Sequence, residues 1–174
     1  MTEAQLIASL IPRSKTLSFS NEPVHKDDLL YLMQVARLAP SARNTQIWFF
    51  TIISDSETIR QTANRLESPG LGTAPVIITA QAGSALFKRM HHEQPFYLID
   101  VPIAMTHISL GASEKGLAVE WVLVQDEPPF IQSLNLDASK RLVAIGFAGF
   151  PAESDPLDEL KETHIFKNKF PSVL

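Results

Sequence analysis

The clearest hydrophobic pattern in the chain is helical and covers residues 27–39. Apolar side chains recur there at i, i+3, i+4 and i+7, counted from Leu29. Asp27 and Asp28 stand at the start of this stretch, where the positive end of a helix dipole favours carboxylates. Pro40 follows it, and a proline disfavours a helical conformation at the residue before it. We therefore expect an amphipathic helix that ends just before Pro40.

Four other stretches are dense in apolar and β-branched residues, which is typical of β-strands. They cover residues 47–54, 75–82, 118–125 and 141–147. The first two are expected to lie in the interior, because large apolar side chains follow one another in them with few charges between.

Signals for further helices lie between these strands. Ser54-Asp55-Ser56-Glu57 matches a capping box and predicts a helix from that point. Residues 97–115 form a long, mostly apolar stretch that Gly116 would end, and residues 128–135 suggest a short helix after prolines. An apolar helix is also expected before Arg13. The interleaved order predicts a layered sheet flanked by helices and leaves strand order and direction open.

Composition narrows the class of protein. A chain of 174 residues, 45 % hydrophobic and 20 % charged, predicts one domain over residues 1–174. The chain has no cysteine, which suits the reducing cytoplasm, and it shows neither a signal-peptide pattern nor a membrane-spanning apolar run. A formal net charge of −4 with interspersed signs argues against a polyanionic partner. We therefore expect a cytoplasmic protein that binds neither nucleic acid nor membrane.

Side-chain patterns for several enzyme classes are absent, among them the nucleophile elbow of hydrolases, phosphate-binding glycine loops and the metalloprotease helix. His91-His92-Glu93 is the one local group of potential metal ligands, and no second cluster completes it, so no metal is expected. His107 lies in the long apolar stretch. A buried or interfacial histidine is the favoured interpretation there, and a proton donor near a ligand is the alternative.

Two polar segments lie where the fold itself would not need them. One is Arg13-Ser14-Lys15, and the other is Pro-Ser-Ala-Arg-Asn-Thr-Gln at residues 40–46, between a helix and a strand. Both offer donors suited to phosphate, sugar-alcohol or ring oxygens of a ligand. By composition alone, an ordinary helix end and an ordinary polar turn are the simpler interpretations.

The arrangement of the whole chain favours the ligand interpretation. Four passages carry it: RSKTLSFSNEPV (13–24), ARLAPSARNTQIWFFTII (36–53), IDVPIAMTHISLGASEKGLAVEWV (99–122) and LVAIGFAGFPAE (142–153). In order and spacing they resemble the nitroreductase family of FMN-dependent oxidoreductases, in its short-chain form, and the second passage is the most specific. The resemblance implies an α+β fold of three layers, with a central, mostly antiparallel sheet flanked by helices, in an intertwined homodimer.

The resemblance also implies that FMN lies between two copies of the chain. Arg13, Ser14 and Lys15 would face its phosphate and ribityl chain. The second subunit would contribute Pro40, Ser41, Ala42 and Asn44. Backbone groups of Trp121, Val122 and Leu123 would hydrogen-bond the redox-active edge of the isoalloxazine ring.

Some positions depart from the family pattern. Leu17 stands where the N-terminal motif has an arginine, Ile47 stands where a proline usually precedes the tryptophan, and Ser154-Asp155 replaces a basic pair that holds phosphate. Phosphate binding would then depend on the remaining cations, which are Arg13, Lys15 and Lys167 or Lys169. The departures predict weaker FMN binding rather than a different fold.

The function implied by the resemblance is transfer of reducing equivalents from NAD(P)H to an organic acceptor such as a nitroaromatic or a quinone. No side chain is expected to be catalytic in the strict sense, because the flavin carries the chemistry. Three alternatives stay open: another flavin reaction on the same scaffold, such as dehalogenation or ene reduction, a non-catalytic or regulatory flavin-binding protein, and a dimeric α/β-type protein that binds no flavin.

Overall fold

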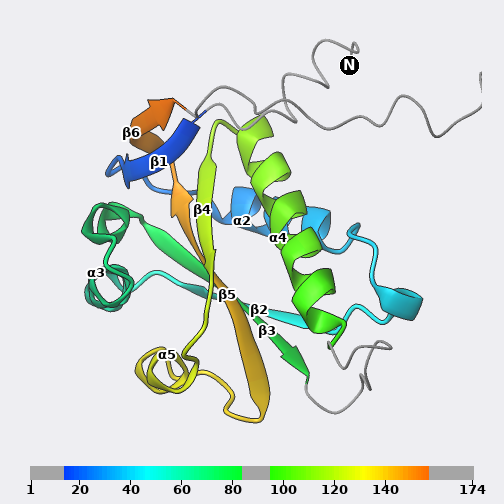
Figure 1. Cartoon of the computed structure of the whole chain (residues 1–174). Helices are drawn as coiled ribbons and strands as arrows, with labels where there is room; N and C mark the ends of the chain where they lie inside the picture. The colour runs from blue at the N-terminus through cyan, green and yellow to red at the C-terminus, as the bar shows by residue number, and fades with distance from the viewer. Residues whose placement is uncertain (1–13, 84–94, 157–174) are drawn as a thin grey trace, which may run out of the picture.

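A four-stranded antiparallel sheet forms the centre of the protein (Figure 1). The computed structural model describes residues 14–83 and 95–156. The sheet order is β2-β3-β5-β4, and its strands are β2 (Trp48–Ile53), β3 (Val76–Gly83), β5 (Lys140–Gly149) and β4 (Ala118–Leu123). Every ladder in it is antiparallel. The predicted strands are therefore present, and their direction, which the pattern left open, agrees with the family resemblance.

Helices cover both faces of the sheet. One face carries α2 (Lys26–Ala36) and α4 (Tyr97–Glu114), and the other carries α3 (Ser56–Arg65) and α5 (Pro128–Ser133) (Figure 1). Two separate apolar clusters fill the spaces between these helix layers and the sheet. The structure thus confirms the predicted three-layer α+β architecture with an antiparallel sheet.

Strand β3 shows why both faces need a cover. Its side chains alternate, so that Ile78 packs into the cluster under α2 and α4, and Ile77 packs into the cluster under α3 and α5. The neighbouring strand β5 changes phase at an irregularity opposite Ala80 and Gln81, where one extra residue, Val143, enters the ladder. Apolar residues consequently face both layers along both central strands.

Helix α4 accounts for the long apolar stretch of the sequence. Its buried side includes Val101, Met105 and Ile108, which all lie in the cluster between α4 and the sheet. Gly116 follows the helix with a φ of 70°, the left-handed conformation that commonly ends helices and favours glycine. The predicted helix and its stop signal are both confirmed.

Two local expectations are wrong. Strand β2 is an edge strand, and Phe49 and Ile52 are exposed on it, so the apolar run at residues 47–54 is not a buried strand. Helix α3 has Asp55 as its N-cap, where the Asp55 carboxylate accepts a hydrogen bond from the Thr58 backbone N–H, instead of a capping box that begins at Ser54. Glu57 pairs with a side chain of its own helix instead of reaching back to the cap.

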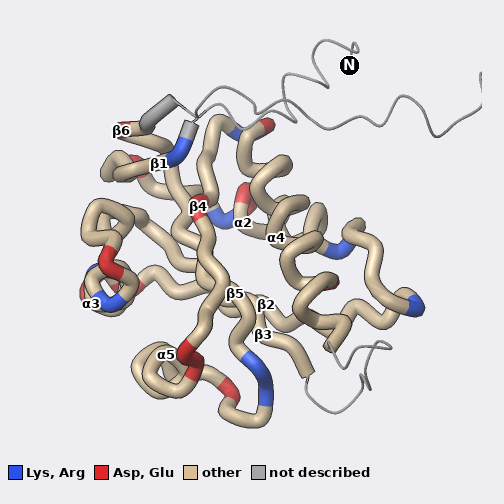
Figure 2. The backbone as a smooth tube through the Cα atoms, in the orientation of Figure 1, with Lys and Arg blue, Asp and Glu red and all other residues tan. Residues whose placement is uncertain are grey.

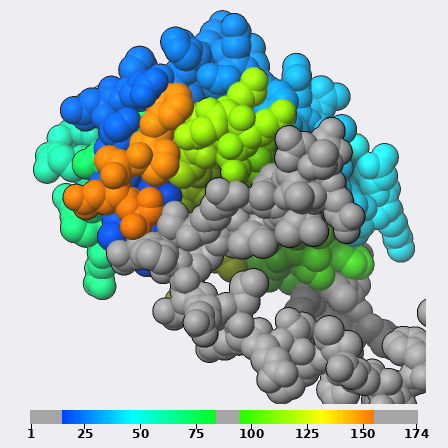
Figure 3. Space-filling view, turned by 90° about the horizontal axis from the view of Figure 1, so that it is seen from above, coloured from blue at the N-terminus to red at the C-terminus, as the bar shows by residue number. Residues whose placement is uncertain are grey.

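A two-stranded ribbon was not expected from the sequence. It joins β1 (Ser14–Phe19) to β6 (Pro151–Pro156) in antiparallel pairing. Lys15 therefore lies in a strand, and not at a helix end; the helix expected before Arg13, and Arg13 itself, lie outside the described residues. The segment that follows Phe150 thus pairs with β1 at its start. In Figure 3 the two strands lie against each other at one end of the molecule.

Positions of both charge signs are distributed over the described backbone (Figure 2). Among the described residues, no helix has the length and apolarity needed to cross a membrane.

The short helix η2 (Pro69–Thr73) supports β1. The Thr73 hydroxyl oxygen accepts a hydrogen bond from the Phe19 N–H at 2.7 Å. Gly70 lies so close to β1 that a Cβ at this position would collide with the Leu17 carbonyl oxygen. Because the obstacle is backbone, β1 itself would have to shift.

We predict that Gly70→Ala lowers the free energy of unfolding by about 1–3 kcal/mol, through overpacking against β1. Gly83→Ala is the matched control, since its Cβ would meet only the Phe49 ring at 3.8 Å. Its effect should stay within about 0.5 kcal/mol. Urea denaturation measures both, and equal effects would show that β1 can move away at no cost.

Candidate functional site

The strand that carries Lys15 is attached to the edge strand β4. The backbone N–H of Thr16 donates to the Glu120 carboxylate, with 3.1 Å between Thr16 N and Glu120 Oε2. Lys15 is exposed beside this contact, and Ser14 begins the strand. The N-terminal polar segment and the strand predicted to pass the flavin ring are therefore neighbours in one chain.

The ladder partner of this segment is β6, in the closing passage of the chain. In the β1–β6 register, Lys15 lies opposite Asp155 and Thr16 lies opposite Ser154. Ser154-Asp155 is the pair that stands in place of two basic residues of the family pattern. The two phosphate segments implied by the resemblance thus meet in the fold, with one of them lacking its positive charges.

Strand β4 has an open edge, because β5 is its only neighbour in the described four-stranded sheet. The Val124 N–H donates to the Val143 carbonyl, and antiparallel pairing alternates from there. By that alternation Val122 turns its backbone groups towards β5, whereas Trp121 and Leu123 turn theirs towards the open edge. Trp121 and Leu123 can therefore offer backbone donors and acceptors to a ligand, and Val122 can offer mainly its side chain.

The 40–46 segment is a tightly folded loop around the short helix η1 (Ala42–Asn44). Three of its residues, Arg43, Asn44 and Gln46, have φ values of 54°, 55° and 46°. This left-handed conformation is easy for asparagine and costly for arginine and glutamine. Such clustered strain is typical of binding sites and needs surrounding contacts to hold it.

Contacts within the loop hold part of this shape. The Ser41 hydroxyl accepts from the Gln46 N–H at 2.9 Å, and the Thr45 hydroxyl donates to the Ala42 carbonyl at 2.7 Å. Asn44 Oδ1 accepts from Gln46 Nε2 at 3.0 Å, so the oxygen of this amide has a partner inside the loop. No described residue accepts from the Asn44 amide N–H groups, and the side chain is exposed. Its donors are open to solvent or to a ligand.

A buried carboxylate holds the loop to α4. Asp100 accepts from the Ala42 backbone N–H through both carboxylate oxygens, at 3.1 and 3.2 Å, and is 2 % exposed. Burial raises the pKa of Asp100, and the hydrogen bond from Ala42 opposes that shift. The sequence analysis assigned Asp100 no role, although an aspartate in the first turn of a mostly apolar helix was a visible signal.

The loop and the β1–β4 neighbourhood lie on different sides of α4. In Figure 1 the loop and η1 lie beyond α4, whereas β1, β6 and the start of β4 lie together at the opposite side, and Figure 3 shows the same separation. One chain therefore brings Ser14 and Lys15 near β4, but it does not bring Pro40, Ser41, Ala42 and Asn44 to them.

Of the histidines considered in the sequence analysis, the structure describes His107 but not His91 and His92. His91, His92 and Glu93 lie outside the described residues. His107 is half-buried on α4. Within residues 14–83 and 95–156, no three potential ligands come together as a metal site.

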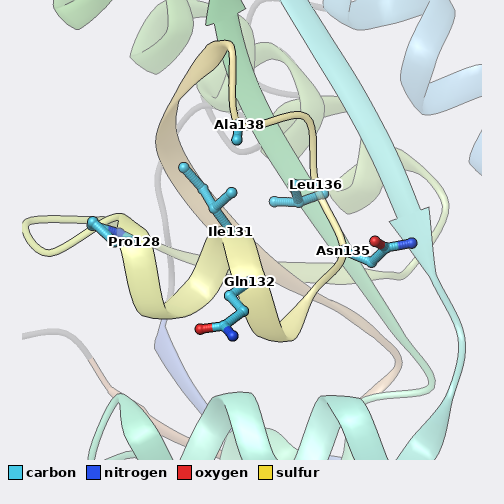
Figure 4. Close-up of a pocket in the computed structure, with 6 residues that line it drawn as sticks. All are labelled: Pro128, Ile131, Gln132, Asn135, Leu136 and Ala138. Carbon is cyan, nitrogen blue, oxygen red and sulfur yellow. The ribbon is translucent and has the colours of Figure 1, made fainter.

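A shallow hollow beside α5 is a separate feature. Figure 4 shows its lining residues, which are Pro128, Ile131, Gln132, Asn135, Leu136 and Ala138. Helix α5 covers the sheet face opposite α4, so this hollow lies away from the 40–46 loop. None of its residues belongs to the segments that the sequence predicted to bind FMN.

Comparison with known proteins tests the resemblance. The family model described as "Nitroreductase family" matches residues 13–68, which include both predicted polar segments. The solved structure of a nitroreductase family protein from Clostridium novyi NT is 26 % identical, covers 87 % of this chain and 86 % of its own, and has a TM-score of 0.75. The chain has the nitroreductase fold. The predicted resemblance to the nitroreductase family is thereby confirmed.

Other proteins similar to this chain have different named activities. An FMN-dependent nitroreductase from Clostridium difficile has a TM-score of 0.77 at 22 % identity, with 94 % of this chain and 99 % of that one covered. A 5,6-dimethylbenzimidazole synthase from Rhodospirillum rubrum is 26 % identical over 82 % of this chain and 80 % of its own. Proteins similar to this chain thus carry more than one named activity, and the reaction must be argued from the site.

Proposed function

We propose that this chain is an FMN-dependent oxidoreductase that transfers reducing equivalents from NAD(P)H to an organic acceptor such as a nitroaromatic or a quinone. The observation that carries the proposal is the arrangement of its predicted flavin segments. The Lys15 strand contacts β4 in one chain, while the 40–46 loop faces away beyond α4. A site shared by two copies would join them. The same fold occurs in an FMN-dependent nitroreductase.

The residues present fit FMN. Lys15 is an exposed cation beside the open edge of β4, and it would hold the phosphate with Arg13 and Ser14. The edge-facing backbone groups of Trp121 and Leu123 would hydrogen-bond the ring, with Val122 beside them. A bound flavin supplies hydride and electron transfer. The protein orients it and keeps one ring face open to NAD(P)H and acceptor in turn.

The second copy would complete the site with Pro40, Ser41, Ala42 and Asn44. Asn44 has amide N–H donors without a described partner, and its exposed position lets them reach a neighbouring chain. The absence of cysteine and the interspersed charge fit a cytoplasmic single-domain enzyme whose partners are small molecules and a second copy.

The homodimer has support on the surface as well. Three large apolar side chains, Leu38, Leu98 and Ile99, are 75 %, 50 % and 40 % exposed. Leu38 comes shortly before Ala42 in the chain, and Leu98 and Ile99 come directly before Asp100 on α4. Exposed apolar groups of this kind favour association.

We predict that the protein sediments as a homodimer at micromolar concentration and that Ile99→Lys shifts it towards monomer, because a charge replaces an apolar contact. Asn64→Lys is the control, since Asn64 is exposed on α3, on the opposite helix layer. Sedimentation equilibrium gives the mass. A monomeric parent protein would remove the shared site and the proposal with it.

The absorption spectrum and NAD(P)H oxidation test the function directly. We expect a flavin spectrum after FMN is added and the excess is removed, and NAD(P)H oxidation that depends on a nitroaromatic or quinone acceptor. Flavin binding without turnover would favour the non-catalytic alternative. Flavin reduction with other acceptors only, such as halogenated substrates or enones, would favour another reaction on this fold. Absence of flavin binding would overturn the proposal.

Asn44 offers a test of the shared site at one residue. We predict that Asn44→Asp keeps the acceptor for Gln46 and the left-handed turn, but weakens FMN binding by about one decade or more, because a carboxylate cannot donate. Asn44→Ala should weaken it similarly. Thermal melts with and without excess FMN measure the effect, since ligand stabilisation follows RT ln(1 + [L]/Kd). An unchanged FMN-induced shift in both variants would remove Asn44 from the site.

A further inference from the structure

Asp100 is a carboxylate in a place that favours apolar side chains. It is 2 % exposed, and its helix neighbours Val101 and Ala104 are fully buried in the cluster beneath α4. Desolvation of a carboxylate is costly, and a well-packed apolar residue in such a position is often neutral or stabilising. Stability alone therefore gives no reason for an acidic residue at this point of α4.

Two features of the structure reduce the cost of this burial. Asp100 lies in the first turn of α4, where the positive end of the helix dipole favours a negative charge. Its two oxygens both accept from one donor, the Ala42 N–H. Burial still outweighs that bond and raises the pKa of Asp100 above its usual value. Among the described residues, the carboxylate thus bonds a single backbone group, the Ala42 N–H of the 40–46 loop.

That backbone group controls the geometry of the residues after it. The Ala42 N–H belongs to the Ser41–Ala42 peptide group, and the carbonyl at the other end of the same peptide accepts from the Asn44 N–H at 2.9 Å. A peptide group is planar, so a hydrogen bond at one end fixes the direction of the other. Asp100 therefore orients the carbonyl that anchors Asn44.

The loop needs such an external contact. Arg43, Asn44 and Gln46 are held in the left-handed region, at a cost that only surrounding contacts can offset. The bonds inside the loop join its residues to one another. The Asp100 bond instead ties the loop to the rigid α4 helix.

We propose that Asp100 is a positioning residue that fixes the 40–46 loop in the shape that presents Asn44 to the FMN bound by the second copy. This inference rests on the proposed function. Asp100 touches neither the flavin nor the acceptor in this account, and it acts through the Ser41–Ala42 peptide. Its loss should weaken FMN binding by more than its effect on the stability of the apoprotein explains.

Three variants of the full-length protein separate positioning from simple stability. Asp100→Ala removes the acceptor, and Asp100→Asn keeps one acceptor oxygen in a side chain of nearly the same shape. Glu127→Ala is the matched control. Glu127 Oε2 also accepts a backbone N–H, that of Leu142 at 2.8 Å, but at α5 on the other helix layer.

Two measurements apply to each variant. Hydrogen exchange of the apoprotein reports protection of the amides from Ala42 to Gln46, and flavin-fluorescence titration reports the Kd for FMN. We expect Asp100→Ala to lose protection at Ala42 and Asn44 and to weaken FMN binding by about tenfold or more, a loss typical of one charge-assisted contact. Asp100→Asn should restore both to within about threefold of the parent, and Glu127→Ala should melt earlier with the parent Kd.

The outcomes distinguish the inference from the proposed function. If the parent binds FMN and Asp100→Ala binds it equally well, the positioning role is overturned and the proposed function stands. If Asp100→Ala weakens FMN binding no more than its lower melting temperature explains, Asp100 is a structural residue and the inference is also overturned. A parent that binds no FMN overturns the proposed function, and the inference that rests on it falls too.

Discussion

The constraint on which the structure depends is the burial of β3 and β5 on both faces. Ile77 and Ile78 are neighbours on β3, and each is fully buried in a different apolar cluster. A sheet with such strands at its centre must carry helices on both sides, because apolar surface left in water costs about 25 cal/mol for each Å². Apolar side chains of the two clusters therefore fill the centre of the molecule.

Polar chemistry is consequently confined to the margins of the sheet. The open edge of β4, the β1–β6 ribbon and the 40–46 loop are the places where backbone or polar side chains face outward. Two of these margins are held by side-chain acceptors: Glu120 and Thr73 accept from backbone N–H groups of β1, and Asp100 accepts from the loop. The proposed FMN site is built from margins, and the buried layers position them.

The sequence predicted best where burial dictates residue type. Runs dense in apolar and β-branched residues identified β3 and β5, and the apolar stretch with Gly116 at its end identified α4. The predicted burial of strand β2 was wrong. Phe49 and Ile52 are apolar residues on an exposed edge, and composition alone does not distinguish an edge strand from an interior strand. Composition likewise does not reveal whether a second chain covers such an edge.

The β1–β6 ribbon and the Asp100 contact escaped prediction for another reason. Both depend on pairs far apart in the chain: β1 and β6 come from its two ends, and Asp100 lies 58 positions from Ala42. Short polar strands have no periodic signal, and a single aspartate in an apolar helix has several ordinary explanations. The site segments themselves came from a family resemblance, and their roles stay proposals that the variants above address.

The position of α4 between the two halves of the proposed site has a genetic consequence. A chain damaged at Lys15 and a chain damaged at Asn44 each lack one half, and neither would form a complete site with its own kind. A mixed dimer of the two would have one site with both defects and one site with none. Two inactive alleles expressed together would therefore complement each other, with at most half of the sites in each mixed dimer restored.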